Sequence, residues 1–268
     1  MEHHQLQPES LFPVIAAQIR EALSTMHLAA LRAVPAQARE LDPELDRRAA
    51  AMDQSYYRLL RLVNLLSAAS VPPDAPLSLE NRDMVGLLRD VCDRAVGLAE
   101  LLGLELRFSC GLYRRVCAVE PRSIEQLLFH LLSNAFKFTP AGGTVTVELW
   151  AQKRQVCFSV TDTGSGISPE RMDTLFDRYL HPDQRDPAPH GMGLGLALCR
   201  LIAERHGGVI VAESEVGRGT RFTVSLPERQ LEGSVSDVAP FDYAGGFNPT
   251  LMALADALPV EAFRIRGL

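Results

Sequence analysis

Four short segments, rich in glycine or polar residues, stand in one order between residues 127 and 227 and constrain this sequence more than any other feature. Two glycines in a turn let the backbone approach a flat ring closely, and a helix that begins after a glycine run presents its first amides to an anion. The order therefore predicts a binding site for a phosphorylated ligand. The segments are LLFHLLSNAFKFTP, VTDTGSGIS, LFDRYL and GMGLGLALCRLIAERHGGVIVAESEVGRGTRFTVSLP.

The spacing of apolar residues around these segments predicts a mixed sheet with helices on it. The class is therefore α+β. The expected helices cover 83–102, 123–138, 169–179 and 194–206, and the expected strands cover 105–108, 115–119, 144–150, 156–161, 209–213 and 221–226.

Two amphipathic helices are expected before this domain, over 9–34 and from Pro43 to the stop at Pro72 and Pro73. A hairpin of two helices cannot bury both of its apolar stripes alone, so a four-helix bundle formed with a second copy, hence a homodimer, is expected. The stripes are Leu11, Ile15, Ile19, Ala22, Met26 and Ala29 in the first helix and Ala49, Met52, Tyr56, Leu59, Val63 and Leu66 in the second.

The composition argues against nucleic-acid binding, a membrane span and a cysteine-based metal or disulfide site. The chain has 268 residues, is 47% hydrophobic and carries a net charge of -6, which gives no general attraction to nucleic-acid phosphates. No apolar run approaches the ~20 residues needed to span a bilayer, and the start lacks the pattern of a signal peptide, so a cytoplasmic protein is expected. The five cysteines are scattered without a CxxC pair, which predicts neither a zinc site nor a disulfide framework.

Taken together, the four segments resemble the N, G1, F and G2 boxes of the GHKL ATPases, and most closely the catalytic domain of sensor histidine kinases. The resemblance implies a GHKL (Bergerat) ATP-binding α/β sandwich behind the helical hairpin. The domains expected from it are a dimerisation hairpin over 1–75, an ATP-binding catalytic domain over 76–230 and a tail of unknown role over 231–268. The expected cofactors are ATP and Mg²⁺.

Asn134 and Lys137 lie three residues apart on an expected helix and so face one side of it. An amide oxygen can ligate Mg²⁺ and an ammonium can meet phosphate. The alternative is an ordinary solvated helix face. One turn earlier stands His130, where imidazole could orient or deprotonate a water near the γ-phosphate, although a polar residue in the pocket wall explains it equally well.

Asp162 ends a strand and precedes the turn Thr163-Gly164-Ser165-Gly166-Ile167. In the family that this sequence resembles, the matching Asp accepts the adenine amino hydrogen, a task that suits a carboxylate because it only accepts hydrogen bonds. An ordinary Asp-Gly turn would explain the glycines as well. The resemblance adds Gly164, Gly166, Ile167 and Thr220 to the expected ATP-binding residues.

The run Gly191, Gly193, Leu194, Gly195 and Leu196 opens a helix and is the expected phosphate site. Its spacing differs from G-x-G-x-x-G and no early βαβ unit precedes it, so a dinucleotide-binding fold is excluded. The stretch between Tyr179 and Gly191 fits a short lid, from which Arg178 or Arg185 could reach the γ-phosphate. His181 stands where kinases of this family often carry arginine.

The first helix departs from the family pattern. Anchoring the alignment on Ile19, Arg20 and Leu23 places Ala17 at the phosphoacceptor position and Gln18 at that of its acidic neighbour. A methyl group cannot accept a phosphoryl group, and an amide cannot act as a base. His27 is the one histidine within this helix and so the alternative acceptor, but Leu28 and Ala29 follow it rather than an acidic residue, which favours a surface or packing role.

With these departures, the resemblance implies an ATP-binding, histidine-kinase-like protein of a two-component-type system without autophosphorylation on its own bundle helix. A response regulator or a partner kinase is the expected partner. Two alternatives stay open: a protein kinase acting on a partner, like the anti-sigma-factor serine kinases of this superfamily, and a non-catalytic ATP-dependent binding module.

Overall fold

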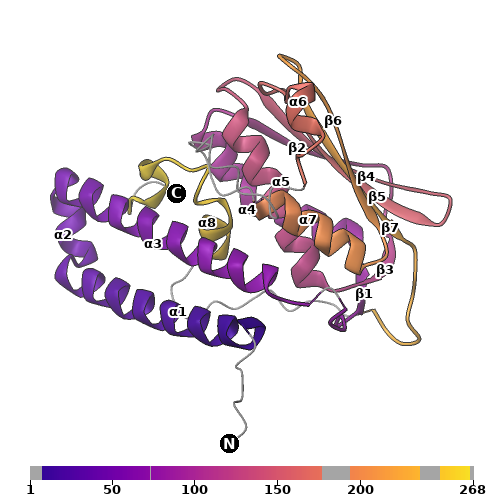
Figure 1. Cartoon of the computed structure of the whole chain (residues 1–268). Helices are drawn as coiled ribbons and strands as arrows, with labels where there is room; N and C mark the ends of the chain where they lie inside the picture. The colour runs from indigo at the N-terminus through magenta and orange to yellow at the C-terminus, as the bar shows by residue number, and fades with distance from the viewer. Residues whose placement is uncertain (1–7, 73, 177–193, 236–247, 266–268) are drawn as a thin grey trace, which may run out of the picture. The chain divides into compact units, whose positions relative to one another are not determined.

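A computed structural model describes residues 8–72, 74–176, 194–235 and 248–265 of the chain (Figure 1). The chain divides into two compact units. The first comprises Met1–Pro72 together with Leu258–Leu268, and the second comprises Pro73–Ala257. The chain therefore passes from one unit to the other twice.

The first unit is a helical hairpin. It contains α1 (Pro8–Ala33), the short α2 (Ala36–Leu41) and α3 (Pro43–Ala69). Asp42 ends α2 and caps α3, because its side chain accepts hydrogen bonds from the amides of Glu44 and Leu45. Pro43 fits the first position of α3, where no intrahelical donor is needed.

One face of α1 packs along α3. Ala16 is buried there, Arg20 donates to Asn64 Oδ1 at 3.2 Å, and the ring of His27 stacks on Tyr56. These positions recur at helical spacing, so they form one stripe.

The apolar stripe expected in α1 lies outside this contact. Ile15, Ile19 and Met26 are exposed, as are Met52 and Leu59 of α3. The residues of α1 that contact α3 are Ala16, Arg20 and His27, and each follows a residue of the predicted stripe by one position. The predicted stripe itself is therefore not covered within one chain.

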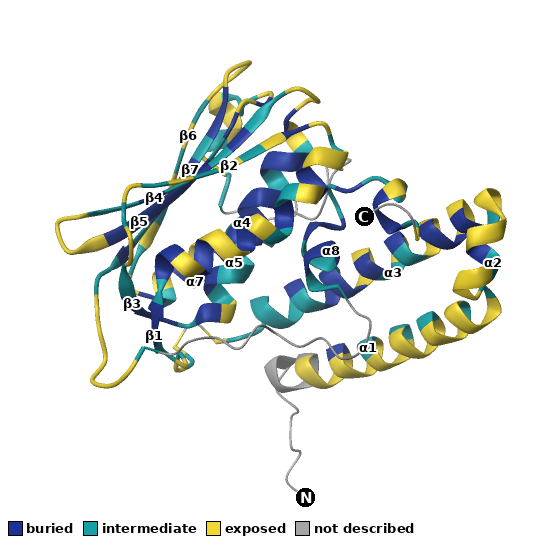
Figure 2. Ribbon diagram, turned by 180° about the vertical axis from the view of Figure 1, so that it is seen from behind, coloured by how far each residue is buried: buried dark blue, intermediate teal, exposed yellow. Residues whose placement is uncertain are grey.

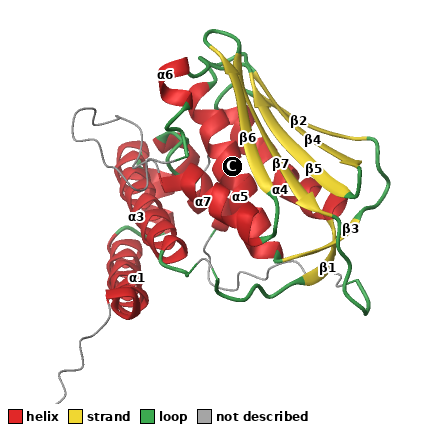
Figure 3. Ribbon diagram, turned by 45° about the vertical axis from the view of Figure 1, so that its right-hand side comes forward, coloured by secondary structure: helices red, strands yellow, loops and turns green. Residues whose placement is uncertain are grey.

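The second unit is built on a five-stranded sheet with the order β2-β4-β5-β7-β6. Only the β2–β4 pair is parallel, so the sheet is mixed. Helices α4, α5 and α7 lie on one face of it (Figure 3). The strands are β2 (Glu105–Cys110), β4 (Thr144–Gln152), β5 (Gln155–Asp162), β6 (Val209–Glu215) and β7 (Gly219–Pro227), and the helices are α4 (Met84–Leu101), α5 (Pro121–Phe138) and α7 (Leu194–Arg205). The α+β class predicted from the sequence is confirmed.

The core of this unit lies between the sheet and α5. Alternate residues of β4 are buried, and both sides of α5 are covered along its middle (Figure 2). The fully buried side chains include Val145, Val147, Val156, Phe158, Val224, Leu127, Leu128, Leu131 and Leu132.

Two elements of the second unit differ from the sequence prediction. The helix expected over 169–179 is a single turn, α6 (Pro169–Met172), and residues 173–176 form turns. A small sheet of β1 (Glu80–Asp83) and β3 (Val116–Val119) was only half predicted, because β1 consists of the polar sequence ENRD. Such a strand carries no apolar signal.

The C-terminal segment is divided between the units. Helix α8 (Pro249–Leu254) packs on α5 of the second unit, whereas the 3₁₀ turn η1 (Val260–Phe263) packs on α3 of the first. Pro259 stands between the two elements and immediately precedes η1, where a missing backbone donor is tolerated.

Among the helices described, none combines the length and hydropathy required to span a bilayer.

Candidate functional site

Four parts of the second unit meet at one place: the end of α5, the loop after β5, the β6–β7 hairpin and the start of α7. Ser165 donates its amide to Phe138 O at 3.2 Å, and Gly217 donates to Ser165 O at 2.8 Å. A Cβ added to Gly195 would lie 3.6 Å from His130 Nδ1. Residues from three of the four segments that the sequence singled out, those around His130, Asp162 and Gly195, are thus brought together.

Asp162 stands at the centre of this site. Its Oδ1 accepts hydrogen bonds from the amides of Gly164 at 2.8 Å and Thr220 at 3.3 Å, and the residue is 7% exposed. Burial raises the pKa of its carboxyl group, while the two amides act in the opposite direction. The carboxylate is therefore fixed in orientation by backbone alone.

Two glycines allow the loops to close around this carboxylate. A Cβ at Gly164 would lie 2.4 Å from Phe138 O, and one at Gly219 would lie 1.9 Å from Asp162 O. Gly219 also has a φ of 112°, which other residues rarely adopt. Both positions require glycine for close backbone packing.

A hydroxyl pair joins the loop to the β6–β7 hairpin. Ser214 Oγ accepts from the amide of Ile167 at 2.8 Å and lies 2.9 Å from Thr220 Oγ1. Ile167 and Thr220 were predicted from the sequence. Ser214 was not, because a single serine in a strand gives no signal of its own.

Helix α5 supplies the polar side chains of the site. His130, Asn134 and Lys137 follow one another at spacings of four and three residues, which places them on the same side of the helix. His130 is 6% exposed, and Asn134 and Lys137 are partly exposed. The described part of α7 begins at Leu194, so Leu194, Gly195 and Leu196 form its first turn beside His130.

Several expected site residues lie outside the described part of the chain. They are Arg178, Gly191 and Gly193, together with the expected lid between Tyr179 and Gly191 and its residues His181 and Arg185.

His206, at the end of α7, has a structural role beneath the site. Its Nε2 accepts from the amide of Glu120 at 3.1 Å, and its Nδ1 lies 2.8 Å from Ile202 O, so the neutral ring with a proton on Nδ1 satisfies both contacts. Burial lowers the pKa of this ring. The imidazole ties the end of α7 to the residue before α5.

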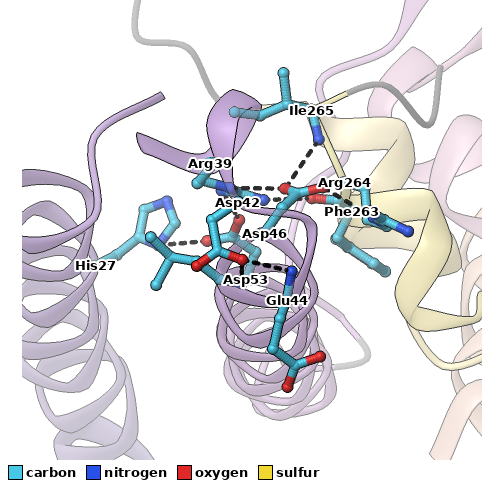
Figure 4. A network of polar contacts seen from close by, with 10 residues as sticks. His27, Arg39, Asp42, Glu44, Asp46, Asp53, Phe263, Arg264 and Ile265 are labelled. Atoms are coloured by element: carbon cyan, nitrogen blue, oxygen red, sulfur yellow. Dashed lines mark hydrogen bonds and ion pairs between the residues drawn. The ribbon is translucent and has the colours of Figure 1, made fainter. Parts of the chain in front are cut away.

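The hairpin unit holds the expected phosphoacceptor position. Ala17 and Gln18 are exposed on α1. His27 instead lies against α3, where its ring stacks on Tyr56 and its Nδ1 is 3.6 Å from Asp53 Oδ1 (Figure 4). Burial lowers the pKa of His27, and Asp53 acts against that shift. This is the geometry of a packed side chain.

Comparison with known proteins places this geometry in context. The model of the family described as histidine kinase-, DNA gyrase B-, and HSP90-like ATPase matches residues 119–230. Sensor protein SrrB of Staphylococcus aureus (strain N315) is 34% identical over 184 residues, which make up 67% of this chain and 31% of SrrB. The circadian input-output histidine kinase CikA of Synechocystis sp. is 34% identical over 164 residues, or 59% of this chain and 22% of CikA. This chain thus spans less than a third of either relative.

Solved structures show the same fold. Full-length ShkA in complex with AMPPNP superposes with a TM-score of 0.65 at 25% identity, over 83% of this chain and 46% of ShkA. The catalytic domain of the histidine kinase ThkA gives a TM-score of 0.51 at 23% identity, over 57% of this chain and 97% of that domain. The second likeness concerns the fold alone.

Proposed function

This chain belongs to the sensor histidine kinase family of GHKL ATPases, and we propose that it is an ATP-binding signalling protein of a two-component-type system that does not phosphorylate its own bundle helix. The observation that carries the first half is Asp162. A buried carboxylate held by two amides, within a loop of closely packed glycines, suits the recognition of a flat base with an amino group.

The adenine contact would use the second carboxylate oxygen. Both described hydrogen bonds of Asp162 involve Oδ1, so we expect Oδ2 to accept the amino hydrogen of adenine. Gly164, Gly166 and Ile167 would line the base, and Thr220 would support Asp162 from β7. Guanine carries an oxo group at the corresponding position and would meet a second acceptor there.

Asn134 and Lys137 would serve the phosphates. Mg²⁺ binds through one or two protein oxygens and the phosphates of the substrate, so the amide oxygen of Asn134 fits this ion without a cluster of carboxylates. The ammonium of Lys137 and the first turn of α7 would neutralise phosphate charge, with Gly191, Gly193 and Arg178 as further candidates. Bound Mg²⁺ would stabilise negative charge on the transferred group.

His130 remains a candidate for orienting or deprotonating a water near the γ-phosphate. Its position against the first turn of α7 supports this role. Its burial supports the alternative of a polar residue in the pocket wall.

The missing acceptor supports the second half of the proposal. Ala17 is exposed, as a residue that receives a phosphoryl group must be, but its methyl side chain has no nucleophile. Gln18 beside it has no basic carboxylate. His27 is engaged with Tyr56 and Asp53 on α3, which favours packing over catalysis.

We further propose a homodimer. Apolar side chains are exposed at helical spacing on both long helices of the hairpin. They are Ile15, Ile19 and Met26 of α1 and Met52 and Leu59 of α3. A second copy would bury these side chains in a four-helix bundle. A response regulator or a partner kinase is the expected binding partner.

Two measurements test this function together. Mg²⁺-ATP at 100 times its Kd should raise the free energy of unfolding by about 2.7 kcal/mol and the melting temperature accordingly. Incubation with γ-³²P-ATP should leave the chain without acid-labile phosphate. No thermal shift at millimolar nucleotide contradicts ATP binding, whereas phosphohistidine on the wild-type chain contradicts the missing acceptor.

A labelled partner would decide between the alternatives. Transfer of ³²P to a histidine or a serine of another protein indicates a kinase acting in trans, which the side chains of Asn134 and Lys137 would allow. ATP-dependent binding without transfer indicates a binding module.

A further inference from the structure

The C-terminal segment is anchored in the second unit by α8. Asn248 caps this helix, because its Oδ1 accepts from the amides of Thr250 and Leu251. Leu251, Leu254 and Ala255 are buried, and α8 packs on α5. Burial of leucine side chains stabilises a packed contact, so α8 is held firmly on α5.

The next residues are anchored in the first unit. Leu258 is 2% exposed, and its carbonyl oxygen accepts from Gln54 Nε2 at 2.7 Å. The buried ring of Phe263 lies 5.6 Å from that of Tyr57 on α3, centroid to centroid. A buried amide paired with a backbone carbonyl and an aromatic contact make a specific seat for this segment.

Charged side chains, of which Arg39 and Asp46 are buried, complete the second anchor (Figure 4). Asp46 of α3 accepts from Arg39 Nε at 3.0 Å and from Arg264 Nε at 2.8 Å. Arg39 also donates to Asp53 at 2.8 Å and to Phe263 O at 3.0 Å. Two arginines face two aspartates, and one of the four comes from the C-terminal segment.

We propose that residues 248–265 are an intramolecular strap, which ties the nucleotide-binding unit to the helical hairpin by a second connection besides the one at Pro72–Pro73. The two anchors follow one another almost without slack, since Leu254 and Leu258 are both buried and lie only four residues apart. A short linker holds its second anchor at high effective concentration. Release of the anchor on α3 would return the chain to a single connection and widen the range of positions open to the two units.

The strap follows from the packing of the tail and does not require the proposed function. It would limit the motion of the units whether or not a nucleotide is bound. A strap that opens and closes would regulate any activity that requires the two units to approach each other.

Single-molecule energy transfer on the full chain tests the strap. Fluorophores are attached through an unnatural amino acid at the exposed positions Arg47 and Gln152, one in each unit. Labelled chains are mixed with excess unlabelled protein, so that energy transfer reports on a single chain whether or not chains associate. We expect a narrow distribution of transfer efficiencies for wild type and a clearly broader one for the double variant Phe263→Ala with Arg264→Ala. The control is Glu261→Ala, an exposed residue of the same turn.

Two further measurements keep the proposal testable if the double variant unfolds. Insertion of about twelve Gly and Ser residues after Ala257 adds roughly 20 Å of reach and should broaden the distribution while both anchors stay intact. Hydrogen exchange should show residues 258–265 protected in wild type and in the insertion variant, and exchanging at least about tenfold faster in the double variant. A wild-type distribution as broad as that of the insertion variant, or a wild-type segment that exchanges like unfolded chain, would overturn the strap.

Discussion

Arg264 and Asp46 lie 218 positions apart in the sequence, and their side chains meet at 2.8 Å between Nε and Oδ2. The carboxylate of Asp46 is 7% exposed and also pairs with Arg39, which is equally buried. Burial acts to raise the pKa of Asp46, but the hydrogen bonds from Arg264 and Arg39 outweigh it, and the pKa is lowered. Arg264, from the C-terminal segment, therefore helps to keep a buried carboxylate charged.

Removal of the Asp46 side chain should lower the free energy of unfolding substantially. Asp46→Ala leaves the guanidinium of Arg39 buried beside Asp53 with one partner fewer, and loss of one member of a buried charge pair costs about 3–5 kcal/mol. Urea unfolding followed by a probe in the first unit should show a loss of that size. Glu44→Ala removes an exposed carboxylate of the same helix and should cost much less, because solvent screens its ion pairs with Arg47 and Arg48. Equal losses in the two variants would contradict a buried network.

The same carboxylate predicts a pH dependence. Because the folded pKa of Asp46 is depressed, its stabilisation is fully present above its unfolded pKa and is lost as the pH falls through the folded value. Wild type should therefore lose stability between about pH 5 and pH 3 more steeply than Asp46→Asn. Parallel unfolding curves for the two proteins over this range would count against the prediction.

Asp162→Asn should separate nucleotide binding from folding. The amide oxygen of asparagine can still accept from Gly164 and Thr220, so the melting temperature without ligand should change little. The side chain amino group, however, would face the amino group of adenine as a second donor. Most of the thermal shift with Mg²⁺-ATP should disappear, whereas the exposed variant Asp173→Asn should retain it. A full shift in Asp162→Asn would exclude Asp162 as the base-recognition residue.

Two glycine substitutions should act in opposite directions. Gly164→Ala places a methyl group 2.4 Å from Phe138 O, and overpacking of this kind costs about 1–3 kcal/mol or more. Gly97 lies exposed within α4 with no atom within 4 Å of its Cβ position, so Gly97→Ala should stabilise the protein by about 0.5–1 kcal/mol. Thermal unfolding measures both. A stabilising Gly164→Ala would contradict the close approach of the loop to α5.

His206 should make the second unit sensitive to mild acid. The pKa of this buried ring is lowered from its ordinary value of 6.5, so the neutral ring stabilises the fold above about pH 6.5 and the contribution is lost as the pH falls below it. His206→Gln keeps an acceptor for the Glu120 amide without titrating, and should flatten the pH dependence between about pH 7 and 5.5. A histidine titration by NMR gives the ring pKa directly. A value at or above 6.5 would contradict the assignment.

Much of the second unit could be predicted because its signals are local. Alternating apolar residues gave the long strands, and the glycine-containing segments gave the residues that gather around Asp162. Ser214 and the polar strand β1 carried no such signal. The packing of the tail on α3 could not be predicted for a different reason. Arg39, Asp46 and Arg264 are charged residues of the kind usually found on surfaces, and only tertiary contacts bury Arg39 and Asp46 and pair Asp46 with Arg264.

The packing of α8 on α5 also bears on how this protein can be divided. A fragment that ends at Pro227, where the sheet is complete, would lack Leu251 and Leu254 and would uncover the apolar surface of α5 beneath them. Newly exposed apolar patches promote association between molecules. The solubility of the isolated nucleotide-binding unit thus depends on retaining a helix that lies beyond its last strand.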